Sequence, residues 1–288
     1  MLVMGSERRR GASKDVTHYT SKKSGLPPLR AYFKDVWRRR EFAIELSSST
    51  LRSQQSSTFF GQLWLVINPL LLATVYYVLV IILSGGKNRG AEYFTHLLAG
   101  LFAFYFVAGC MSGGASSVTG VGKLVMNQAF PRLLLPITAA MVAIRRFIPT
   151  MIVYLIISLI LGRPFSLNQL LAIPSFILLI IFGTGLAALF ATMQVYFRDV
   201  ASLLPYISRI WLYISPILYY PDQIPAAFAA AMPLNPLYGL MGIWTETVVR
   251  GELPPANLWI NAIAWTIFSI CIGTYFFLRK EREFAVRL

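Results

Sequence analysis

The stretch AMVAIRRFIPTMIVYLIISLILG, residues 140–162, reads as a membrane-crossing helix except that two adjacent arginines interrupt it. About 20 mostly apolar residues cross a hydrocarbon core of roughly 30 Å, so the stretch is long enough. Counting back from Gly162 at about 1.5 Å per residue places Arg145 and Arg146 about one turn inside the near edge of that core. An arginine at mid-membrane costs about 3 kcal/mol, and snorkelling relieves much of this near an edge. The pair therefore either anchors a long span or includes a residue that faces something polar.

The whole chain has the composition of a protein that crosses a membrane several times. Of its 288 residues 56% are hydrophobic and 13% are charged, and the mean hydropathy is +0.61. A soluble domain has about twice that charged fraction. We therefore predict an all-α integral membrane protein with six spans, at 63–83, 93–111, 135–161, 170–197, 203–220 and 258–278.

The net charge of +14 is better explained by membrane topology than by nucleic-acid binding. Nineteen of the 26 Lys and Arg residues fall in the segments that are cytoplasmic if the N-terminus is cytoplasmic, whereas four fall outside and three within spans. Positive residues gather on the cytoplasmic side of membrane proteins. We therefore place both termini in the cytoplasm and expect membrane lipids but no nucleic acid as partners.

Three regions follow along the chain. Residues 1–28 are polar and basic, which predicts a disordered tail. In 29–62 the apolar residues of 29–46 gather on one face, which predicts an amphipathic helix on the cytoplasmic membrane surface or, alternatively, packed on a partner protein. Residues 63–288 form the six-span domain. Its outer segment 221–257 holds two helix-capable pieces, 226–232 and 237–249, which favours a re-entrant hairpin.

An enzymatic reading finds little support in the residue inventory. The segment SVTGVGKL, residues 117–124, misses the phosphate-loop pattern at its first glycine and at its last position. Acids in or near the spans are few and scattered, and the two cysteines form neither a metal cluster nor a disulfide framework. We therefore expect no cofactor or metal on this chain and an energy source in another subunit.

An ordered set of short motifs is similar to the transmembrane subunit of type-2 ABC exporters, above all to the Wzm and TagG group that exports lipid-linked polysaccharide, including actinobacterial members thought to move galactan. One departure is segment 47–57, which is rich in serine where the family has a basic and aromatic lead-in. The motifs are GQLW (61–64), NP (68–69), NQAFPR (127–132), LP (135–136), YFRDV (196–200), SP (215–216) and NPLY (235–238).

The resemblance implies a homodimer in the plasma membrane of a bacterium, with two copies of a separate ABC ATPase, which binds the ATP and Mg²⁺. It also implies that 121–132 is the coupling helix that sits in a groove of the ATPase, with Phe130 as its apolar anchor. A plain connector that ends at a proline is the alternative. The residues assigned to the coupling helix are Lys123, Asn127, Phe130, Pro131 and Arg132.

The predicted fifth span carries a polar stripe on one helical face, because Tyr206, Arg209, Tyr213 and Tyr220 follow a helical repeat. Such a stripe lines either a pore or a helix contact. Aromatic rings offer flat surfaces on which sugars can slide, and Tyr76 and Tyr77 of the first span join the candidates. For Arg145 and Arg146 we add the hypothesis that at least one faces a portal and holds the pyrophosphate of a polyprenyl-linked glycan.

The resulting prediction is the channel-forming subunit of an ATP-driven exporter of lipid-linked polysaccharide, such as galactan or an O-antigen-like glycan, in which the hairpin gates the outer end. The same architecture exporting a small amphipathic drug or lipid is the alternative. A second alternative is a membrane-embedded transferase that acts on polyprenyl lipids. It requires that this chain alone converts such a lipid.

Overall fold

The computed structural model describes residues 28–55, 63–83, 90–162, 166–220 and 224–288, and all regular elements within them are helices. The predicted tail 1–28 lies outside this part of the chain except for Pro28. Within it, four helices are long and apolar enough to cross a membrane: Gly90–Thr119, Leu134–Ile160, Leu167–Tyr196 and Ala256–Arg287. Two shorter apolar helices, Val66–Ile82 and Val200–Ile214, accompany them. The expectation of an all-α membrane protein is thus confirmed, while the count of six spans stays a prediction.

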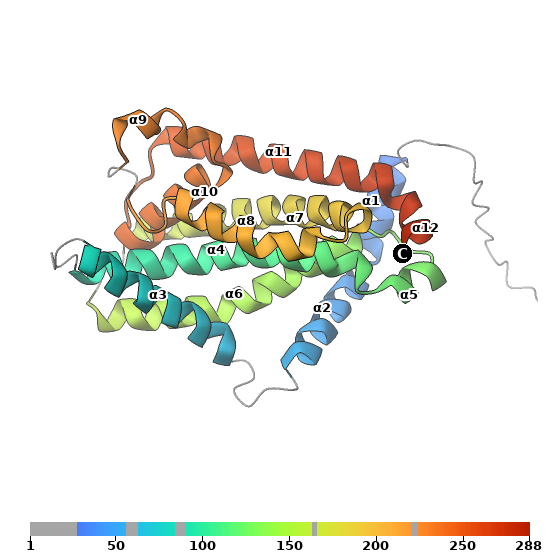
Figure 1. The fold of residues 1–288 in the computed structure, drawn as a ribbon, viewed down its shortest axis with the longest axis horizontal. Coiled ribbons are helices and arrows are strands. Elements are labelled where there is room, and N and C mark those ends of the chain that lie inside the picture. Colours follow the sequence, from blue (N-terminus) through green and yellow to red (C-terminus); the bar gives the residue numbers. More distant parts are fainter. Residues whose placement is uncertain (1–27, 56–62, 84–89, 163–165, 221–223) are drawn as a thin grey trace, which may run out of the picture.

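The centre of the molecule is α4 (Gly90–Thr119), most of which is buried. It packs against α6 (Leu134–Ile160) and α7 (Ala172–Tyr196), and α7 packs in turn against α11 (Ala256–Lys280). Figure 1 shows these long helices running side by side. Glycines let α7 and α11 approach closely, since a Cβ on Gly273 would lie 2.0 Å from the carbonyl oxygen of Gly185. Such contacts between small residues are the usual way in which membrane helices pack.

Two shorter helices flank this centre, α3 (Trp64–Leu83) and α8 (Val200–Ile214), and both contact α4. Each leaves apolar side chains exposed, among them Val75 and Ile82 on α3 and Ile210 on α8. The predicted fifth span 203–220 is wrong at its end, because the helix stops at Ile214. Pro216 disfavours a helical conformation in the residue before it, and Ser215 is extended with ψ 151°.

The predicted amphipathic helix consists of two helices, α1 (Leu29–Arg38) and α2 (Arg40–Gln55), with a break at Arg39. The single continuous helix expected over 29–46 is therefore wrong. The apolar side of α1 is exposed, with Trp37 at 70%. α2 instead packs against α6 (Figure 1). The turn at Arg39 thus separates a helix with a free apolar face from one that is docked on the bundle.

At one end of the bundle lie α9 (Ala226–Ala229), the 3-10 turn η4 (Met232–Leu234), α10 (Pro236–Thr245) and the π-helical turn η5 (Glu246–Arg250). The first predicted piece, 226–232, is shorter than expected and ends at Ala229. The second is present as α10 and η5. Asn235 caps α10 by accepting a hydrogen bond from the backbone N–H of Leu237. α10 is buried against α11 and α4, so protein shields it.

The opposite end of the bundle, which we call the α5 end, holds α1, α5 (Gly122–Asn127), the 3-10 turn η6 (Glu281–Glu283) and α12 (Phe284–Arg287). At the other end of the bundle, the 3-10 turn η2 (Leu167–Leu171) contacts η5 and leads into α7. The coupling helix expected over 121–132 is wrong in length, since α5 ends at Asn127 and residues 128–133 are not helical. We call 128–133 the connector between α5 and α6.

Candidate functional site

A cavity of about 990 Å³ lies among α3, α4, α6 and α8. Its walls are mainly aromatic and aliphatic, with a few polar groups between them. Among the described residues that line it, none is acidic and none is histidine or cysteine. Its polar and aromatic lining comprises Trp64, Asn68, Tyr76, Phe102, Phe104, Tyr105, Phe106, Ser112, Arg146, Phe147, Thr150, Ser208, Arg209 and Tyr213.

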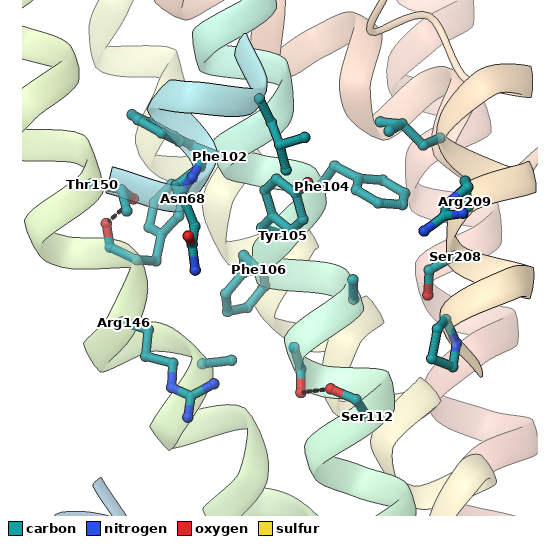
Figure 2. Close-up of a pocket in the computed structure, with 18 of the residues that line it drawn as sticks. Asn68, Phe102, Phe104, Tyr105, Phe106, Ser112, Arg146, Thr150, Ser208 and Arg209 are labelled. Atoms are coloured by element: carbon teal, nitrogen blue, oxygen red, sulfur yellow. Dashed lines mark hydrogen bonds between the residues drawn. The ribbon is translucent and has the colours of Figure 1, made fainter. Parts of the chain in front are cut away.

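Two arginines reach this cavity from different helices. Figure 2 shows Arg146 on α6 and Arg209 on α8 at opposite sides, with Tyr105 and Phe106 of α4 between them. A guanidinium offers five donors in a planar fork and remains charged, so it suits phosphate or carboxylate oxygens. The cavity thus combines two cationic groups with flat apolar walls, an arrangement that fits a large amphipathic anion better than a small polar one.

A second cavity of about 510 Å³ adjoins the first, between α2, α4 and α6. Both cavities are lined by Gly109, Ser112, Ala143 and Arg146, so Arg146 stands where they meet. The lining of the second cavity is different in character, since apart from Arg146 it consists of small, aliphatic and hydroxyl-bearing residues and contains no aromatic ring. These hydroxyl groups belong to Thr50, Ser112, Ser116, Ser117 and Thr138.

The neighbouring Arg145 has a different environment. Its guanidinium donates to the Oγ of Ser48 at 2.5 Å and to the carbonyl oxygen of Ile44 at 3.4 Å, both on α2. Adjacent residues on a helix point about 100° apart, which explains why the two arginines separate. Arg145 therefore fastens α2 to α6, while Arg146 is the one of the pair that lines the cavities.

The predicted tyrosines also divide into those that line the large cavity and those that do not. Tyr76 lines the large cavity, where its hydroxyl lies 3.5 Å from that of Tyr213. Tyr105 stands in the same wall and was absent from the predicted set, although a lone tyrosine within the apolar run of α4 is the signal that could have found it. Asn68 and Ser112 were missed likewise.

Three of the predicted tyrosines lie elsewhere. Tyr77 packs its ring against Phe94, with ring centroids 5.3 Å apart. Tyr206 is 66% exposed and does not line either cavity, so of the predicted stripe on α8 only Arg209 and Tyr213 face the large cavity. Placing Tyr220 on that stripe is wrong, because the helix has already ended.

Tyr220 belongs instead to a cluster at the end of the bundle that holds α10. Its ring lies 4.2 Å from the His96 ring, and the Arg250 guanidinium lies 4.7 Å from its ring centroid. Arg250 also pairs with Glu246 at 3.1 Å. These contacts join α4, η5 and the turn after α8.

The connector is held on both sides by the chain itself. Phe130 packs against Phe42 of α2, with ring centroids 5.2 Å apart, and is half-buried. Part of its ring is thus covered by the chain itself, and its role as the apolar anchor for the ATPase stays a prediction. Met126 on α5 is more open, at 55% exposed. Pro131, the residue after Phe130, is buried. Arg132 donates from its backbone N–H and its guanidinium to Glu281.

Lys123 and Asn127 lie on α5, and their side chains fall outside the described part of the structure. Within that part, no group of three or more His, Cys, Asp or Glu side chains could hold a metal ion. The candidate site is therefore the pair of cavities around Arg146, with α5 and the connector as a second region of interest.

Comparison with known proteins shows the family to which the residues around the site match. The family model described as ABC-2 type transporter matches residues 44–249, which run from within α2 to within η5. These residues include both cavities and the connector.

Curated relatives are similar over almost the whole chain. Two proteins named O-antigen export system permease protein RfbA, both from Klebsiella pneumoniae, are 27% and 25% identical over 246 residues, or 85% of this chain and 94% of theirs. A protein of the same name from Myxococcus xanthus is 22% identical over 254 residues, which cover 88% of this chain and 97% of the relative.

Proposed function

This chain belongs to the ABC-2 type transporter family, and from that premise we propose that it is the membrane subunit of an ATP-driven exporter of lipid-linked polysaccharide. Members of the family are transport subunits that work with an ABC ATPase. The relatives named as O-antigen export permeases support a polysaccharide as the cargo. In this proposal ATP and Mg²⁺ bind to the separate ATPase, and this chain supplies the path.

The observation that carries the proposal is the cavity that Arg146 and Arg209 share with aromatic rings. Sugar rings present C–H faces that pack on aromatic surfaces, and shallow contacts of this kind do not fix a polymer in one register. A guanidinium fork at the junction of the two cavities would hold the pyrophosphate of a polyprenyl carrier. We assign this role to Arg146 rather than Arg145, whose guanidinium is engaged by α2.

The assembly we propose is a homodimer that binds two ATPase copies, with six spans in each protomer. The exposed apolar sides of α3 and α8 would meet the second copy or lipid. The α5 end would face the cytoplasm, because the basic residues of α1 and those from Arg279 to Arg287 lie there. The α9 to α10 hairpin would then gate the outer end of the path. Galactan is one glycan that fits this proposal.

The test is export by the intact permease and ATPase complex in cells. Depletion of the chain should cause polyprenyl-diphosphate-linked glycan to accumulate on the cytoplasmic side. Arg146→Ala should reproduce this accumulation, and Arg146→Lys should relieve it only in part, because an ammonium lacks the bidentate fork. Arg279→Ala, at the exposed end of α11, is the matched control.

Normal glycan export in cells that lack the chain would refute the proposal. Loss of resistance to an amphipathic drug in those same cells would favour the small-molecule exporter instead. ATP hydrolysis or lipid turnover by the purified chain alone would favour an enzyme.

A further inference from the structure

Glu281, the first residue after α11, joins three segments that are far apart in the chain. Its Oε2 accepts a hydrogen bond of 2.7 Å from the Tyr32 hydroxyl of α1. Its Oε1 accepts one of 2.7 Å from the backbone N–H of Arg132 in the connector, and its carbonyl oxygen accepts one of 2.5 Å from the Arg132 guanidinium. The Tyr32 oxygen accepts in turn from the backbone N–H of Leu133 at 3.3 Å. Every bond crosses between two of the three segments.

The network is chemically matched and well shielded. Burial first, and then the adjacent Glu281 carboxylate, raise the pKa of Tyr32, so its hydroxyl stays protonated and able to donate. Burial raises the pKa of the Glu281 carboxyl, whereas the hydrogen bonds from the Tyr32 hydroxyl and the Arg132 backbone N–H lower it. In its ionised form the carboxylate makes stronger bonds to these two donors than a neutral acceptor does. The three segments are thus held at fixed distances from one another at the α5 end.

Further contacts attach the same connector to the N-terminal helices. Phe130 packs on Phe42, and Arg39 donates to the carbonyl oxygen of Ala129 at 3.2 Å. On the other side α12 lies against α5. If α5 and the connector move, α6 therefore cannot be the only helix that follows. Both α1 and α11 are hydrogen-bonded to each other and to the connector, residues 128–133.

We propose that Glu281 is a positioning residue for the coupling of ATP hydrolysis to transport, because it makes α1, the connector and α11 move as one unit. This inference rests on the proposed function, in which an ATPase acts on the α5 end. Its physical basis is a contiguous hydrogen-bonded link between the segment that receives the motion and two helices remote from it in sequence.

The chain offers a matched control at the same end. The Tyr196 hydroxyl donates to Oε2 of Glu283, which also pairs with Lys280 at 3.0 Å. This second tyrosine–glutamate pair joins the end of α7 to η6 without touching the connector, and the Glu283 side chain is 43% exposed. Glu283→Gln therefore makes the same chemical change two residues away without cutting the link to the connector.

The experiment compares wild type, Glu281→Gln and Glu283→Gln as complexes with the ATPase in proteoliposomes. A glutamine has a single side-chain oxygen, so one of the two donors that Glu281 satisfies must face an amide group. We expect Glu281→Gln to remain assembled and to hydrolyse ATP, but to export about tenfold less glycan per ATP, within the usual range of coupling effects. Glu283→Gln should keep the wild-type ratio.

A wild-type ratio in Glu281→Gln, or an equal fall in Glu283→Gln, would overturn the inference. If Glu281→Gln fails to assemble, Tyr32→Phe serves instead, since it removes one bond and leaves those to Arg132. An unchanged ratio in Tyr32→Phe would then count against it. Non-additive shifts in Tm for Tyr32→Phe and Glu281→Gln test the contact itself. If wild type exports no glycan with its ATPase, the proposed function fails, whereas the contact is still judged by Tm.

Discussion

Arg145 donates a hydrogen bond of 2.5 Å to the hydroxyl of Ser48, although 97 residues separate them in the chain. This bond fixes α2 to α6 and removes Arg145 from the cavity that Arg146 lines. Ser48 lies in segment 47–57, which is rich in serine. The small hydroxyl there provides the space and the acceptor that a long guanidinium side chain needs.

Arg145→Ala should loosen α2. A hydrogen bond to a charged group contributes about 1.5–3 kcal/mol, so we expect the variant to lower the free energy of unfolding by about 2 kcal/mol. Limited proteolysis near Arg52 and thermal unfolding in detergent measure this. Ser48→Ala should account for much of the same loss, and the double variant should be little worse than Arg145→Ala. Fully additive losses would show that the two side chains do not interact.

Adjacent tyrosines on α3 allow transport and stability to be separated. Tyr76 lines the large cavity, whereas Tyr77 packs on Phe94. We expect Tyr76→Ala to lower export about threefold to tenfold at normal Tm, in line with aromatic contacts worth about 0.5–1.5 kcal/mol. Tyr77→Ala should instead lower the free energy of unfolding by about 2 kcal/mol.

Tyr76→Phe is the control for the hydroxyl. Its distance of 3.5 Å from the Tyr213 hydroxyl is long for a hydrogen bond, so export should stay near wild type. If Tyr76→Ala lowers Tm as much as Tyr77→Ala does, the separation between a cavity wall and a helix contact is wrong.

Periodicity and hydropathy predicted the long helices because both report on local sequence. They failed where distant residues decide the outcome. Nothing within 140–162 indicates that Arg145 meets Ser48 while Arg146 faces a cavity. Likewise, the helical-wheel pattern for 203–220 assumed one continuous helix. That helix ends before Ser215 and Pro216, and Tyr220 lies against His96 instead. The face of α8 that turns inward depends on α4, which no single-helix pattern contains.

Gly273→Ala should disrupt the packing of α11 on α7. The added Cβ would lie 2.0 Å from the Gly185 carbonyl oxygen, so the two backbones must separate. Overpacking of this kind costs about 3 kcal/mol, and we expect a matching fall in the free energy of unfolding. The control is Gly122→Ala, whose new Cβ would have Leu288 as its nearest neighbour at 3.9 Å. Equal thermal stability of the two variants would contradict the close approach of α7 and α11.

The surface that meets the ATPase can be located by comparing Met126 with Phe130. Met126 is exposed on α5, whereas Phe130 is half-buried against Phe42. Met126→Asp should abolish co-purification of the ATPase at unchanged Tm, because it places a charge on the outer face alone. Phe130→Asp should lower Tm as well, since its carboxylate would be forced into an apolar contact. Co-purification that survives Met126→Asp would show that α5 does not form the contact, and a normal Tm in Phe130→Asp would show that its ring does not support the connector.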